Sequence, residues 1–161
     1  MGLMQVLPET GAEVSRDLGL PWVGADSLYD SDTNIVLGSA YLRQLLDKYG
    51  GQPYQAIAGY NAGPTALARW QSQRPGMDPD FWIETISYKE TRDYVARVLA
   101  FSVIYDWRLN GDSLVLDDRM RGRLDGPRKR FSCPTQTPPS SDASQRKPAQ
   151  QTSPQRASSQ P

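Results

Sequence analysis

The 161-residue sequence contains no histidine and a single cysteine, Cys133. These absences exclude a histidine-containing zinc cage, a Ser-His-Asp triad, a disulfide framework and a CxxC redox pair. No apolar run approaches the roughly 20 residues needed to span a bilayer, and residues 1–8 lack the basic start and long apolar stretch of a secretion signal. We therefore predict no transmembrane segment and no metal or other cofactor, and expect any chemistry to rest on carboxylates, amides and hydroxyls.

The net charge is zero, but the two signs are unevenly distributed along the chain. Residues 1–125 hold 12 Lys/Arg and 17 Asp/Glu, whereas residues 126–161 hold 6 and 1. The second segment also contains 7 of the 13 prolines and few apolar residues, too few to offset the entropy lost on ordering it. We predict a folded domain over residues 1–125 and a disordered, basic Pro/Ser/Gln-rich tail over residues 126–161.

Three consecutive basic residues, Arg128, Lys129 and Arg130, begin this tail. Such a cluster can contact an anionic surface weakly, for example a phospholipid or a wall polymer. A solvated basic hinge is the more common reading of a short basic run. We expect no nucleic-acid partner.

Apolar residues in the first 110 positions recur mostly at helical spacing. The long segment 89–109 places Tyr94, Val95 and Val98 near one face, and Asp32 or Thr33 is expected to cap the helix that precedes Gly50. Only residues 114–116 look extended, so the predicted fold class is mainly α, without the strand–helix alternation of a parallel sheet. The predicted helices span approximately residues 8–18, 33–49, 52–60, 65–71 and 89–109, with a turn around residues 78–84.

Two short segments place an amide side chain at a bend, at Gln5 and at Asn61. Amides carry donors and acceptors together, which suits sugars with hydroxyl and N-acetyl groups, and the ring of Tyr60 can stack on a pyranose. Purely structural interpretations compete with this one: Asn61 as the left-handed residue of a helix cap, Gln5 as a surface residue and Met4 as a core side chain. Local chemistry does not decide between them.

Three longer strings are specific when taken together: GLMQVLPET at residues 2–10, AGYNAGP at residues 58–64 and WIETISYKETRDYVARVLA at residues 82–100. In this order and with these separations, over residues 1 to about 110, they resemble the soluble lytic transglycosylase family. The resemblance implies a lysozyme-like helical domain, similar to goose lysozyme, that binds the glycan strands of peptidoglycan in a cleft. It also implies a periplasmic or envelope-associated parent protein whose export signal is not in this chain.

The resemblance also implies a mechanism in which a single glutamic acid cleaves the bond between N-acetylmuramic acid and N-acetylglucosamine. It protonates the glycosidic oxygen and then accepts the proton of the muramic 6-hydroxyl, which attacks the anomeric carbon and leaves a 1,6-anhydro end without water. A lone carboxyl with a pKa raised by burial suits this role, and the second carboxylate of the usual glycosidase is not required. The family acid lies in a Glu-Ser motif ahead of the GLMQ string. We therefore expect it upstream of Met1, expect the domain to lack its first helix and expect this chain to be inactive alone.

Matching the strings residue by residue assigns substrate-binding roles and no catalytic residue within the chain. Glu84, in an aromatic and aliphatic run, is matched to a family glutamate that lines the substrate site opposite the acid, although an ion pair with Arg92 or Arg97 is an ordinary alternative. Glu90 is explained by the favourable interaction of a negative charge with a helix N-terminus. The predicted substrate-binding residues are Met4, Gln5, Tyr60, Asn61 and Glu84.

Three functions remain open at this point. The first is a peptidoglycan lytic transglycosylase domain, active in the full-length parent. The second is a non-catalytic murein-binding module. The third is a hydrolytic muramidase of the same fold, with Glu84 recruited as the acid.

Overall fold

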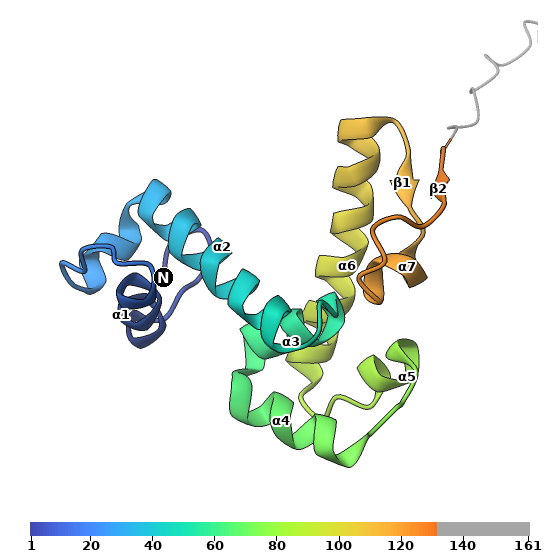
Figure 1. Ribbon diagram of the computed structural model, residues 1–161, viewed down its shortest axis with the longest axis horizontal. Helices are drawn as coiled ribbons and strands as arrows, with labels where there is room; N and C mark the ends of the chain where they lie inside the picture. The colour runs from blue at the N-terminus through green and yellow to red at the C-terminus, as the bar shows by residue number, and fades with distance from the viewer. Residues whose placement is uncertain (132–161) are drawn as a thin grey trace, which may run out of the picture. The chain divides into compact units, whose positions relative to one another are not determined.

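Seven α-helices, one 3₁₀ helix and two short strands make up residues 1–131, the part of the chain that the computed structural model describes (Figure 1). This confirms the mainly α fold class. None of the described helices has the length and apolar composition needed to cross a membrane. In chain order the elements are α1 (Pro8–Asp17), η1 (Ala25–Tyr29), α2 (Ser31–Lys48), α3 (Pro53–Ala62), α4 (Pro64–Gln73), α5 (Pro79–Glu84), α6 (Lys89–Asn110), β1 (Ser113–Leu114), α7 (Leu116–Met120) and β2 (Arg128–Lys129).

Local sequence signals account for most of the helix ends. Gly111 adopts the left-handed conformation, with φ 75°, directly after α6, as expected for a glycine in this position. The start of α2 differs from the prediction, because Asp30 is the N-cap residue and its carboxylate accepts a hydrogen bond from the Thr33 amide at 2.8 Å. The predicted turn around residues 78–84 is a short helix, α5, because Asp78 caps it and Pro79 occupies its first position.

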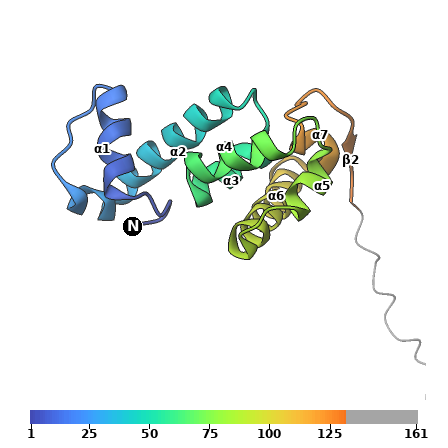
Figure 2. The ribbon, with the colours of Figure 1, turned by 90° about the horizontal axis from the view of Figure 1, so that it is seen from below.

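Two apolar clusters hold the helices together. The smaller cluster contains Val6, Val14, Leu28 and Leu37 and joins α1, η1 and α2. The larger one, which includes Trp70, Trp82, Val95 and Leu99, joins α3 through α7. Helix α3 contacts α2, α4, α6 and α7, and both views show it in the middle of these elements (Figures 1 and 2). The residues at its C-terminal end are therefore held from several sides.

The folded part continues beyond the predicted boundary at residue 125. Strand β2 pairs antiparallel with β1, with Ser113 opposite Lys129. The carboxylate of Asp106 on α6 accepts hydrogen bonds from Arg128 Nη2 at 2.6 Å and from the Leu114 amide at 3.0 Å. Residues 126–131 therefore belong to the domain, and Arg128, expected in a free basic cluster, is paired with carboxylates. The rest of the predicted tail, with Cys133, lies outside the described residues.

The segment predicted as extended over residues 114–116 is divided between two elements. Only Leu114 belongs to a strand, whereas Leu116 begins helix α7. Met120 at the end of this helix is buried in the larger apolar cluster. Tertiary packing therefore overrides the β-branched and aliphatic run that indicated a strand.

Candidate functional site

The first seven residues form a loop that a buried asparagine from α2 holds in place. The side chain of Asn34 is fully buried. Its Nδ2 donates to the carbonyls of Met1 and Leu28, both at 2.8 Å, and its Oδ1 accepts from the Met4 amide at 2.6 Å. Because backbone groups of a loop must find partners when they are taken out of water, this one side chain fixes the backbone of Met1 and Met4 next to α2.

Gln5 occupies a tight turn within this loop. Its φ of 52° makes it the one non-glycine residue among residues 1–131 with a positive φ. The turn is closed on the carbonyl of Gly2, which accepts from the Gln5 amide at 3.2 Å and from Gln5 Nε2 at 2.6 Å. Gly2 itself has a φ of 66°, and a Cβ there would collide with Asn34. Gln5 is exposed, as in the surface interpretation, but its backbone is strongly constrained.

Tyr60 joins the loop to α3. Its hydroxyl donates to the carbonyl of Met4 at 2.8 Å, and its ring lies 5.3 Å from that of Tyr41 on α2. Partial burial, with a smaller effect of neighbouring tyrosines, raises the pKa of Tyr60 to about 12, so the phenol remains a hydrogen-bond donor. Close approach at this point requires Gly38, where a Cβ would lie 2.5 Å from the Cβ of Met4.

Asn61 follows within α3, and its amide is oriented by α6. Its Oδ1 accepts a hydrogen bond from the hydroxyl of Thr91 at 2.7 Å, and Thr91 is buried. No hydrogen bond within residues 1–131 uses Nδ2, which leaves this group of the amide as a donor for a ligand. The interpretation of Asn61 as a left-handed cap is wrong, because Gly63, with φ 84°, takes the positive-φ position after α3.

Met4, Gln5, Tyr60 and Asn61 line one groove of about 610 Å³, which we call the motif groove. A smaller hollow of about 220 Å³ adjoins it and shares Gln5, Leu7, Tyr60 and Asn61 with it. Mostly apolar side chains complete the lining of the motif groove: Leu3, Leu7, Leu42, Ile57, Glu90, Tyr94 and Val98. Among residues 1–131, Glu90 is the one carboxylate that lines it. The groove therefore combines amide and phenol donors with apolar walls and one acidic group.

The structure places Glu90, and not Glu84, in this groove. Glu84 is exposed at the end of α5, where Trp82 and Ile83 occupy the buried face, and only its backbone carbonyl contacts Arg92, at 3.5 Å. Glu90 lies in the first turn of α6, and Tyr94 and Val98 follow it at intervals of four residues on the same helix face. The alternative role of Glu84, an ion pair with Arg92 or Arg97, is also absent from the salt bridges of residues 1–131.

Sequence reasoning missed three residues of this arrangement. Asn34 bonds backbone groups of the N-terminal loop, and Thr91 bonds the side chain of Asn61, 30 positions earlier. Neither role follows from a local pattern, although Thr91 lies in the third motif string. Glu90 carried a usable signal, because it precedes Tyr94 and Val98 by one and two helical turns. Among residues 1–131, no three acidic or cysteine side chains gather in a way that could hold a metal ion.

Comparison with known proteins gives a consistent family match. Residues 1–83 match the family model described as the transglycosylase SLT domain, and residues 85–114 match that of the soluble lytic transglycosylase helical domain. The chain is 35% identical over 106 residues to the soluble lytic murein transglycosylase of Salmonella typhimurium, and 31% identical over 124 residues to that of Escherichia coli. These matches cover 65% and 76% of this chain but only 16% and 19% of the relatives.

Solved structures give the same result for the fold. An inactive mutant of the lytic transglycosylase Slt from Pseudomonas aeruginosa superposes with a TM-score of 0.65 at 44% identity, covering 68% of this chain and 18% of that one. The 70-kDa soluble lytic transglycosylase in complex with bulgecin A gives a TM-score of 0.66 at 32% identity, with the same coverage. The chain thus spans less than a fifth of the length of these relatives. Because the transglycosylase SLT model alone matches more than half of its residues, the chain belongs to the soluble lytic transglycosylase family.

Proposed function

We propose that the chain is the SLT domain of a peptidoglycan lytic transglycosylase and that the motif groove holds the glycan strand. The observation that carries this proposal is the convergence of Met4 and Gln5, from the first sequence motif, with Tyr60 and Asn61, from the second, on one groove. The two motifs are more than 50 positions apart in the sequence, and the Tyr60–Met4 hydrogen bond joins them directly.

The chemistry of the groove suits an N-acetylated sugar polymer. Gln5 offers an exposed amide at a fixed turn, and the free Nδ2 of Asn61 is a donor for a hydroxyl or acetamido oxygen. The apolar walls fit the less polar faces of pyranose rings, and the neutral phenol of Tyr60 adds a half-buried aromatic edge. We assign Glu90 an orienting role on the sugar hydroxyls, in place of the role first expected for Glu84.

In this proposal the reaction is non-hydrolytic cleavage between N-acetylmuramic acid and N-acetylglucosamine, with a 1,6-anhydro end as product. The 161 residues contain no Glu-Ser pair of the kind to which the resemblance assigns the catalytic acid. We therefore expect the chain by itself to bind murein without releasing fragments, and the proton donor to come from a longer protein. Such a protein would act in the periplasm or elsewhere in the cell envelope, where murein lies.

A murein assay tests this proposal. Insoluble murein is incubated with the chain, the pellet is checked for bound protein and the supernatant is examined by mass spectrometry. The proposal predicts that binding falls at least tenfold in the double variant Gln5→Ala, Asn61→Ala. Binding is predicted to stay unchanged in Gln44→Ala, because Gln44 on α2 does not line the motif groove. Failure of the chain to sediment with murein would refute it.

The same assay distinguishes the two alternatives. A longer protein that includes the chain is predicted to release anhydro ends. Reducing ends would identify a hydrolytic muramidase instead, but the exposed position of Glu84 outside the groove gives that alternative no support. Tight binding by the longer protein with no release would identify a non-catalytic murein-binding module.

A further inference from the structure

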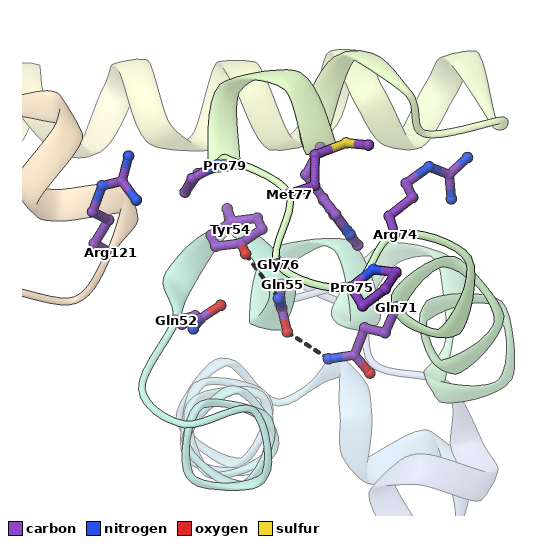
Figure 3. Close-up of a pocket in the computed structure, with 11 residues that line it drawn as sticks. Gln52, Tyr54, Gln55, Gln71, Arg74, Pro75, Gly76, Met77, Pro79 and Arg121 are labelled. Carbon is purple, nitrogen blue, oxygen red and sulfur yellow. Dashed lines mark hydrogen bonds between the residues drawn. The ribbon is translucent and has the colours of Figure 1, made fainter.

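A second pocket, of about 450 Å³, lies between α3, α4, α5 and α7 and shares no residue with the motif groove (Figure 3). Its volume is within the range of about 300 to 1,000 Å³ that is typical of small-molecule sites. Three glutamines, Gln52, Gln55 and Gln71, line it together with Tyr54 and Arg74. We call it the glutamine pocket. Trp82 is the one residue of the motif strings that lines it, and the proposed glycan chemistry does not account for the pocket.

A relay of hydrogen bonds fixes two of the glutamines and leaves one donor free. Gln71 Nε2 donates to Gln55 Oε1 at 2.5 Å, and Gln55 Nε2 donates to the hydroxyl oxygen of Tyr54 at 2.8 Å (Figure 3). Because the Tyr54 oxygen is the acceptor in this relay, its own O–H hydrogen is left to donate. The hydrogen bonds within residues 1–131 include no acceptor for it.

Gln52 provides a free acceptor in the same pocket. Its Oε1 is buried and has no hydrogen-bond partner within the described part of the chain. Buried polar atoms without a partner are uncommon in folded proteins, and one that lines a pocket is a candidate contact for a ligand. The side chain does not cap α3, although Gln52 is the N-cap residue by position, so the start of the helix does not explain it.

A secondary amide carries the two complementary groups, a carbonyl that accepts an O–H of the kind Tyr54 offers and an N–H that donates to an oxygen such as Gln52 Oε1. An ionised carboxylate cannot do this, because it has no hydrogen to donate to Gln52. An alcohol can bind both groups, but only through one oxygen atom.

The charges of the pocket add a preference for an acidic group. Arg121 is neutralised by Asp78 at 2.6 Å and Asp117 at 2.9 Å. Arg74, at the opposite end of the pocket from Gln52 in Figure 3, donates to the backbone carbonyl of Thr85 at 2.7 Å and has no ion pair within residues 1–131. Its guanidinium keeps unused N–H groups and an uncompensated charge, which favour a carboxylate.

We propose that the glutamine pocket binds a short peptide. One amide of the peptide lies between Tyr54 and Gln52, and a carboxylate of the peptide lies toward Arg74. This site is separate from the motif groove and does not depend on the proposed glycan function.

The test is a titration of the ¹⁵N-labelled 161-residue chain, followed by NMR, with each of the four stereoisomers of N-acetyl-alanyl-alanine. At least one isomer is predicted to shift the side-chain amide signals of Gln52, Gln55 and Gln71. Its counterpart with a C-terminal methylamide is predicted to bind more weakly, because the carboxylate that Arg74 attracts is gone. Gln52→Leu removes no hydrogen bond of residues 1–131 and is predicted to weaken peptide binding about fivefold, the effect of one lost hydrogen bond. Gln44→Leu, on α2 outside the pocket, is the matched control and is predicted to bind like the wild type.

Three results would overturn the proposal. In the first, no stereoisomer shifts these signals, which would mean that water alone fills the pocket. In the second, Gln52→Leu and Gln44→Leu bind the peptide equally well. In the third, N-acetylglucosamine at the same concentration produces the same shifts, which would assign the pocket to an acetamido sugar. Since the glutamine pocket and the motif groove share no residue, none of these results bears on murein binding by the groove.

Discussion

Replacing Asn34 by alanine removes the side chain that holds the N-terminal loop against α2. Three hydrogen bonds are lost, to the carbonyls of Met1 and Leu28 and from the amide of Met4, and the side chain that makes them is fully buried. At about 1 kcal/mol for each bond, we expect the free energy of unfolding to fall by about 3 kcal/mol. This is a large part of the roughly 5 to 15 kcal/mol that stabilises a typical domain.

Urea unfolding followed by circular dichroism measures this loss, and hydrogen exchange of the Met4 amide tests its cause. Gln44→Ala is the matched control, since Gln44 also lies on α2 and donates one hydrogen bond, to exposed Asp17 at 3.1 Å. We expect this control to change stability by less than about 0.5 kcal/mol. If Asn34→Ala were as stable as the control, or if the Met4 amide kept its protection, the loop would not depend on Asn34.

Three further substitutions test the contacts around the loop and the strand pair. Burial raises the pKa of Tyr60 to about 12, above that of a free phenol, so the protonated phenol stabilises the fold fully below about pH 10 and this stabilisation is lost as the pH rises toward 12. In Tyr60→Phe, the free energy of unfolding measured in urea should therefore fall less between pH 8 and pH 12 than in the wild type. Hydrogen bonds, led by that from Arg128, hold the pKa of Asp106 well below its usual range, so the ionised carboxylate stabilises the fold above about pH 4 and this stabilisation is lost as the pH falls. Asp106→Asn should therefore have a lower free energy of unfolding at pH 7 than the wild type. It should also lose less of that free energy on acidification to pH 3. Gly38→Ala should cost about 1 to 3 kcal/mol by overpacking against Met4, despite the better helix propensity of alanine, and a variant as stable as the wild type would show that the loop can move away freely.

The sequence predicted the helices wherever periodicity and end signals agreed. The ends at Gly111 and at Gly50 followed from the ease with which glycine takes a positive φ, and both residues have one in the structure. Helix α5 was predicted only as a turn, because six residues are too few for a periodic pattern. Strand β2 was assigned to the tail, because nothing near Arg128 in the sequence reveals that Asp106, 22 positions earlier, pairs with it.

The candidate site was predictable to the extent that its residues lie in the motif strings. Met4, Gln5, Tyr60 and Asn61 were named from those strings, and the structure brings them to one groove. The choice between Glu84 and Glu90 depended on the direction in which each helix faces, and this is determined by the packing of α5 and α6. Asn34 lies outside every string and acts on residues about 30 positions away, so only the folded chain reveals its role.

The central claim is that the motif groove binds an N-acetylated glycan. A titration of the ¹⁵N-labelled chain with the tetramer of N-acetylglucosamine, followed by NMR, tests it most directly. We predict that the shifts will concentrate on the backbone amides of residues 3–7 and 60–62 and on the side-chain amides of Gln5 and Asn61. An unchanged spectrum at millimolar tetramer, or shifts confined to residues outside the groove, would contradict the claim.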